Sequence, residues 1–168
     1  MAITFKQVKF NFFRLMPIFL LLFISLNGNS IIDLKFFSVN IHYILVYYWV
    51  LKKPQFLGYG WIFLSGIITD VVFGTPIGLN SLTLMSIAAV ATYIRVVTVK
   101  ISLFSDWISF ILALLIGNFI YFSSLYFTDY SINYFYLLKN SIFTLIFYPI
   151  LWGIFEILLN LTKIESNA

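Results

Sequence analysis

The sequence contains no cysteine and only one histidine, His42. The absence of cysteine excludes disulfide frameworks, thiolate zinc sites and cysteine nucleophiles. A single histidine excludes the helical metal site that needs two histidines four residues apart. We therefore expect neither a bound metal ion nor thiol chemistry in this chain.

Acidic residues are also scarce, which limits the hydrolytic chemistry open to the chain. Intramembrane aspartyl hydrolysis needs two carboxylates in one site. Asp70 and Asp129 could form such a pair, but Asp129 lies in a Thr-Asp-Tyr-Ser segment that is typical of a solvated turn. The loop from Gly74 to Gly78 lacks the lysine of nucleotide-binding phosphate loops. The sequence thus predicts a protein that is not an enzyme and needs no cofactor.

Hydrophobic residues are abundant, making up 62% of the 168 residues, with a mean hydropathy of +1.02. This composition lies outside that of soluble domains and predicts an integral membrane protein. A helix needs roughly 17–25 apolar residues to cross a bilayer. We predict an all-α bundle of six transmembrane helices, forming a single membrane domain over residues 1–168. The six apolar stretches run at about 10–26, 36–51, 55–74, 78–97, 103–127 and 134–161.

The second of these stretches is the shortest. It contains the polar residues Asn40 and His42, which we expect at the membrane interface. If this stretch does not cross the bilayer, five spans remain and the C-terminus changes sides.

Basic residues alternate between the two sides of the six-span arrangement. Positive charge accumulates in short cytoplasmic loops. Only Lys35 and Lys139 fall on the outer side, so both termini are predicted to be cytoplasmic. The basic residues lie in short breaks between apolar runs, which argues against a nucleic-acid partner. Those on the cytoplasmic side are Lys6, Lys9, Arg14, Lys52, Lys53, Arg95, Lys100 and Lys163.

Two glycines and one acid lie at intervals of four residues in the third span. Gly66, Asp70 and Gly74 share one helical face, which is bare enough for a neighbouring backbone to approach. Pro76 and Gly78 then favour a tight turn, with Asn80 or Ser81 capping the next helix.

Asp70 lies near the outer end of its span, where it is either a solvated acid or an inward-facing group. Intramembrane acids are by default candidate functional groups. An inward, desolvated Asp70 is expected to be protonated and to act as a hydrogen-bond donor.

The last span carries a second polar face, formed by Pro149, Gly153, Glu156 and Asn160. Pro149 is expected to kink the helix and to free the carbonyl of Leu145, which a neighbouring Ser, Thr or water must then satisfy. Glu156 can reach the cytoplasmic headgroups or take part in a proton relay, and we favour the headgroup interpretation. The predicted docking residues for a partner helix are Gly66, Asp70, Gly74, Pro76, Gly78, Pro149, Gly153 and Glu156.

Two segments resemble a known family. They are Tyr48-Trp49-Val50-Leu51-Lys52-Lys53-Pro54, and the run from Gly60 to Asn80 that contains Asp70, Gly74, Pro76, Gly78 and Leu79. Both are similar to the central region of the bacterial rod shape-determining protein MreD family. The resemblance covers about residues 43–95, and only the hydropathy agrees in the last two spans.

The resemblance implies a non-enzymatic scaffold or regulatory subunit of the cell-elongation complex in the bacterial cytoplasmic (inner) membrane. Its implied partners are MreC, a RodA-type glycosyltransferase that polymerises peptidoglycan with a class B penicillin-binding protein, and, indirectly, actin-like MreB. The family's fold is similar to that of the substrate-binding subunits of ECF-type vitamin transporters. The alternative function is therefore that of a small-molecule-binding membrane subunit of a transporter.

Overall fold

The computed structural model describes residues 5–27, 33–34, 37–98, 102–128 and 134–167, and within them the chain is an all-α protein with six helices. A two-residue strand, β1 (Asp33–Leu34), pairs antiparallel with β2 (Phe37–Ser38) between the first two helices. The helices are α1 (Phe5–Asn27), α2 (Ile41–Lys52), α3 (Tyr59–Phe73), α4 (Leu79–Val97), α5 (Leu103–Phe127) and α6 (Tyr134–Asn167).

Three of the helices are long and apolar enough to cross a membrane. These candidate spans are Leu79–Val97, Leu103–Phe127 and Leu137–Asn160. Two further apolar segments, Leu15–Asn27 and Tyr59–Phe73, are shorter. By length and composition, the chain therefore has the features of an integral membrane protein.

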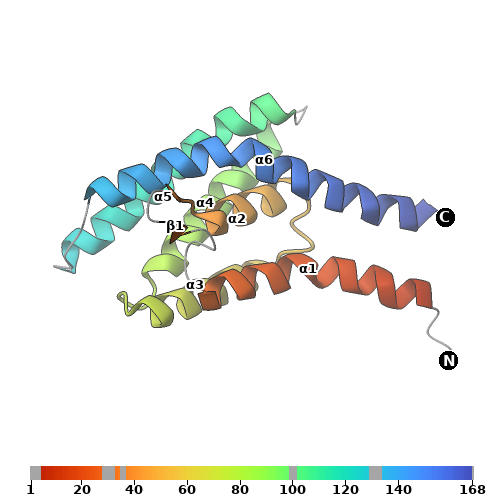
Figure 1. The fold of residues 1–168 in the computed structure, drawn as a ribbon, viewed down its shortest axis with the longest axis horizontal. Coiled ribbons are helices and arrows are strands. Elements are labelled where there is room, and N and C mark those ends of the chain that lie inside the picture. The colour runs from red at the N-terminus through yellow and green to blue at the C-terminus, as the bar shows by residue number, and fades with distance from the viewer. Residues whose placement is uncertain (1–4, 28–32, 35–36, 99–101, 129–133, 168) are drawn as a thin grey trace.

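Successive helices run in opposite directions, so the N- and C-termini lie at the same end of the bundle (Figure 1). We call this end, where α2 and α4 finish and α3 and α5 begin, the terminal end. The opposite end contains the connection between α3 and α4 and the start of α6 (Figure 1). The helix boundaries agree closely with the sequence prediction for α4 and α5.

The second helix differs from its prediction. It begins at Ile41 instead of residue 36, because Phe37 and Ser38 pair as a strand and Asn40 caps the helix by accepting a hydrogen bond from the Tyr43 amide. With 12 residues, α2 is roughly 18 Å long, well short of a bilayer core of about 30 Å.

The short α2 lies at the centre of the molecule and packs against α1, α4, α5 and α6 (Figure 1). Every residue from Ile41 to Leu51 is buried, as expected for a helix that is apolar on all sides. Its neighbours contribute Phe110 and Tyr148, whose rings stack at 4.4 Å and enclose Tyr47 edge-on. The core of the bundle is thus built around α2.

The prediction that Asn40 and His42 are interfacial is wrong. Both are buried, with 5% and 1% of their surfaces exposed. The Nε2 atom of His42 lies 3.3 Å from Ser25 Oγ on α1, and the backbone amide of Asn40 donates to Thr144 Oγ1 on α6 at 2.8 Å. These polar groups face inward because partners on neighbouring helices satisfy them.

Gly66 allows α3 and α4 to approach closely. A Cβ atom added at Gly66 would lie 2.3 Å from Ser81 Cα and 2.5 Å from its backbone nitrogen. The Ser81 hydroxyl in turn donates to the carbonyl of Phe63 across the same interface. Within the predicted bare face of the third span, Gly66 is therefore covered by α4 of the same chain, whereas Gly74 is exposed.

We predict that Gly66→Ala lowers the free energy of unfolding by about 1–3 kcal/mol or more, because the added methyl group must displace the α4 backbone. Thermal unfolding in detergent measures this change. Gly60→Ala is the matched control, since a Cβ atom at that position of α3 meets nothing within 4 Å. Equal melting temperatures for the two variants would contradict the assigned role of Gly66.

Candidate functional site

The turn between α3 and α4 is organised by Asp70. The α3 helix ends at Phe73, and Gly74 adopts a left-handed conformation with φ of 64°, as favoured by glycine after a helix. The prediction that the third span ends near Gly74 is confirmed. The following helix is capped by Gly78, with φ of 98°, and not by Asn80 or Ser81 as predicted.

The Asp70 carboxylate supplies the cap that Gly78 lacks. Its Oδ2 accepts from the Gly78 amide at 2.8 Å, and its Oδ1 accepts from the Asn80 amide at 3.0 Å. The Asn80 side chain and the Thr75 hydroxyl also donate to Oδ1, at 2.8 Å and 2.9 Å. A negative charge at this position also matches the positive end of the α4 dipole.

Asp70 is fully buried and accepts hydrogen bonds from all four of these donors. The prediction that an inward Asp70 acts as a donor is therefore wrong, because backbone amides and an amide side chain supply the hydrogens. Its hydrogen-bonding capacity is used within the hairpin.

The remaining predicted residues of this segment lie at the tip of the hairpin. Gly74 is exposed, while Pro76 and Gly78 are partly buried. Apolar side chains surround them on the outer surface. We call the exposed group of Val71, Val72, Phe73 and Ile77 the hairpin-tip patch.

We predict that Asp70→Asn costs about 1–3 kcal/mol of stability, because its new amide group faces the Gly78 N–H and two donors are left opposed. Thr75→Val removes one of the four donors and is expected to cost less. Thermal unfolding of both variants in the same detergent compares them. A larger loss for Thr75→Val than for Asp70→Asn would refute the capping role.

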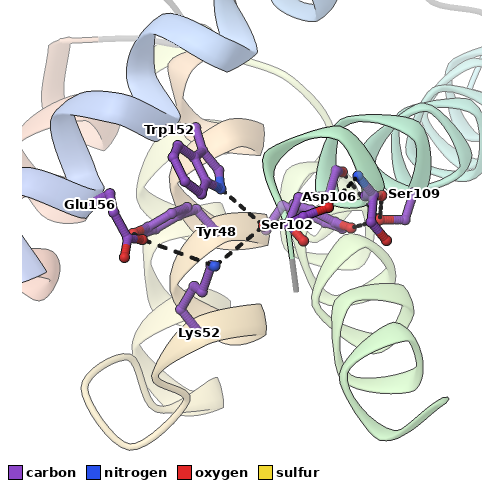
Figure 2. Close-up of polar contacts among 9 residues, drawn as sticks. Tyr48, Lys52, Ser102, Asp106, Ser109, Trp152 and Glu156 are labelled. Carbon is purple, nitrogen blue, oxygen red and sulfur yellow. Dashed lines mark hydrogen bonds and ion pairs between the residues drawn. The ribbon is translucent and has the colours of Figure 1, made fainter. Parts of the chain in front are cut away.

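A second polar group lies at the terminal end, where α2, α5 and α6 meet. Figure 2 shows Lys52 between two carboxylates. Its Nζ lies 3.5 Å from Asp106 Oδ2 and 4.0 Å from Glu156 Oε2. We call these three residues, with Tyr48 and Trp152, the ionic cluster.

Two neutral donors complete the ionic cluster. The Trp152 indole donates to Asp106 Oδ2 at 2.9 Å, and the Tyr48 hydroxyl donates to Glu156 Oε2 at 2.8 Å. Lys52 also lies 5.1 Å from the centre of the Trp152 ring. Each carboxylate thus has a neutral donor as well as the shared ammonium, which offsets the loss of hydration on burial.

The prediction for Glu156 was a position at the cytoplasmic headgroups, without a contact to Lys52 or Asp106. A signal for the ionic cluster was present, because the alternation of spans brings the end of α2, the start of α5 and the second half of α6 to one level. Opposite charges at one level of a bundle are expected to pair. The cluster joins three helices and is buried enough to act as a structural connection.

Pro149, the residue expected to kink α6, frees the carbonyl of Leu145, and the hydrogen-bond donor to this carbonyl differs from the prediction. Trp107 Nε1 of α5 donates to the Leu145 carbonyl at 3.0 Å, where a serine, threonine or water was expected. Pro149 lies inside the helix as predicted, and a Cβ atom at Gly153 would meet nothing within 4 Å. Gly153 therefore leaves open space on α6.

A small polar cavity lies between the start of α2 and the facing parts of α5 and α6. It has a volume of about 30 Å³, enough for a water molecule. Asn118 donates to Ser141 Oγ at its wall, while Asn140 Oδ1 is buried without a hydrogen-bond partner among the described residues. Its lining residues are Asn40, Tyr43, Leu114, Asn118, Tyr121, Leu137, Asn140, Ser141 and Thr144.

Among the residues that the structure describes, no group of three or more histidine, cysteine or acidic side chains could hold a metal ion. Asp129, the proposed second acid of a catalytic pair with Asp70, lies outside the described residues.

Comparison of the chain with protein-family models, with curated proteins and with solved structures gives no match.

We predict that Lys52→Met destabilises the protein by about 3 kcal/mol, because it leaves the Asp106 charge, only 2% exposed, without its counter-ion. The double variant Lys52→Met/Asp106→Asn is expected to recover part of this loss. Thermal unfolding in detergent gives both values.

Lys53→Met is the matched control for this experiment, since Lys53 is adjacent, partly buried and makes no ion pair with another described residue. If Lys52→Met and Lys53→Met unfold at the same temperature, the ionic cluster does not hold the terminal end together.

Proposed function

We propose that this chain is a non-enzymatic scaffold subunit of the bacterial cell-elongation complex in the cytoplasmic membrane. In this role it binds MreC and links it to the RodA-type glycosyltransferase and its class B penicillin-binding protein, with MreB connected indirectly. The proposal rests on the resemblance of residues 43–95 to the MreD family.

The proposed topology has six crossings with both termini in the cytoplasm. The opposite directions of successive helices support it, with α2 and α3 as short crossings inside the bundle (Figure 1). The distribution of basic residues supports the orientation, because Lys52, Lys53 and Arg95 lie at the terminal end.

One observation favours a scaffold most. The residues that carry the resemblance, from Asp70 to Asn80, form a closed hairpin with an exposed apolar tip. Asp70 and Gly66 fix the shape of this hairpin from within, so they act on a partner only through that shape. The hairpin-tip patch, with Ile77 77% exposed, is the surface that we assign to the MreC contact.

The transporter alternative has less support. Pockets for small molecules have volumes of about 300–1,000 Å³. The polar cavity at Asn140 has about 30 Å³, a tenth of the lower limit. Two larger grooves, of about 570 Å³ on α1 and 470 Å³ on α4, are lined largely by exposed side chains on the outer surface of the bundle and do not enclose a ligand. Recovery of a tightly retained vitamin-sized molecule from the purified protein would nevertheless favour the alternative.

We predict that Ile77→Glu reduces the amount of MreC that co-purifies with the tagged protein by about tenfold, the effect of losing roughly 1.4 kcal/mol of contact energy. The variant places a charge in the hairpin-tip patch without touching a buried residue. Quantitative immunoblotting of MreC from the same organism measures its recovery.

Phe127→Glu is the control, because Phe127 is 83% exposed at the end of α5, at the same end of the bundle as the hairpin tip. Recovery of MreC with Ile77→Glu at the level of Phe127→Glu would exclude the hairpin-tip patch as the contact. Absence of MreC from the unmodified protein would overturn the proposed function itself.

A further inference from the structure

An apolar groove runs along the second half of α4 where it passes the start of α3. It has a volume of about 470 Å³. Met85 and Ala89 lie toward the middle of α4, while Thr92, Tyr93 and Val96 belong to its last turns. Tyr59, the first residue of α3, completes the lining.

The length of this groove matches one leaflet of a membrane. From Met85 to Val96 the rise along α4 is roughly 16 Å, at about 1.5 Å per residue. Half of a bilayer core of about 30 Å is about 15 Å. A groove that starts in the middle of a candidate span and finishes at its end fits a single acyl chain lying parallel to the helix.

The end of the groove is polar. The Thr92 hydroxyl donates to the Ala88 carbonyl at 2.8 Å, so the Tyr59 hydroxyl, 2.7 Å from Thr92 Oγ1, is the donor of their contact. This contact is exposed, so the Tyr59 hydroxyl can turn its hydrogen from Thr92 to a lipid oxygen. Hydroxyl groups at this level suit the ester and phosphate oxygens of a lipid, while Met85 and Ala89 suit its hydrocarbon.

Positive charge lies at the same end. Arg95 is exposed in the last turn of α4, next to Val96 of the groove, and makes no ion pair with another described residue. Lys53, which directly follows α2 at this end, also lacks an ion pair among the described residues. Basic groups between helices at a membrane surface attract anionic headgroups.

We propose that this groove binds an anionic phospholipid, with an acyl chain along Met85 and Ala89 and its phosphate near Tyr59, Thr92 and Arg95. The positive charge of Arg95 favours an anionic lipid in this groove. A zwitterionic lipid also brings a phosphate, but its ammonium group offsets that negative charge near Arg95, and an apolar partner helix brings no negative charge. This site lies on a different surface from the hairpin-tip patch and does not depend on the proposed function.

Native mass spectrometry of the full chain tests the proposal. Protein released from detergent is titrated with phosphatidylglycerol or phosphatidylethanolamine carrying the same acyl chains. We expect phosphatidylglycerol to be retained about fivefold better, the factor that one basic residue near an anionic surface contributes. Arg95→Gln should abolish this preference and leave phosphatidylethanolamine retention unchanged.

Two further variants separate the groove from general surface charge. Ala89→Trp, at an exposed position, fills the groove and should reduce the retention of both lipids. Lys139→Gln removes a basic residue near the opposite end and should change neither. Equal retention of the two lipids by the unmodified protein, or undiminished retention by Ala89→Trp, would overturn the proposal.

Discussion

A polar atom inside hydrocarbon has no water to bind, so the buried polar groups of this bundle depend on partners from the chain itself. Among the described residues, Trp49 Nε1, Asn140 Oδ1 and the Tyr148 hydroxyl are buried without such a partner. The described contacts follow this constraint at three levels. Asp70 takes four donors at the hairpin turn, the ionic cluster pairs charges at the terminal end, and the Trp107 indole satisfies the carbonyl that Pro149 frees. These contacts fix how α3 meets α4 and how α6 meets α2 and α5.

The polar contacts have a common consequence for function. Because the hydrogen bonds of Asp70 lie within its own hairpin, its contribution is to fix the shape of the hairpin tip. Glu156 is partly exposed, and its Oε2 accepts from Tyr48 and lies near Lys52, so this oxygen joins α6 to α2. The outer surface of the bundle is instead largely apolar. Under the proposed scaffold function, recognition of a partner depends on the form of the hairpin tip more than on exposed charge.

Much of the fold could be predicted from the sequence, because long apolar runs and the placement of lysine and arginine depend on local composition. The limits of α4 and α5 and the end of α3 at Gly74 follow from such local signals. The position of α2 could not be predicted from local signals. Asn40 and His42 look interfacial in sequence, and only Thr144 and Ser25, distant along the chain, show why they are buried. The pairing of Lys52 with Asp106 was missed for the same reason, since 54 positions separate them along the chain.

The enclosed position of α2 has a consequence for the biogenesis of the protein. Insertion machinery recognises hydrophobic stretches of about 20 residues, and α2 has 12. Three of the helices that enclose it, α4, α5 and α6, leave the ribosome after it does. During synthesis, α2 is therefore only partly covered until these three helices have been made, and its full burial is among the last events of assembly. A ribosome that stalls before α6 leaves this apolar helix without one of the four helices that bury it.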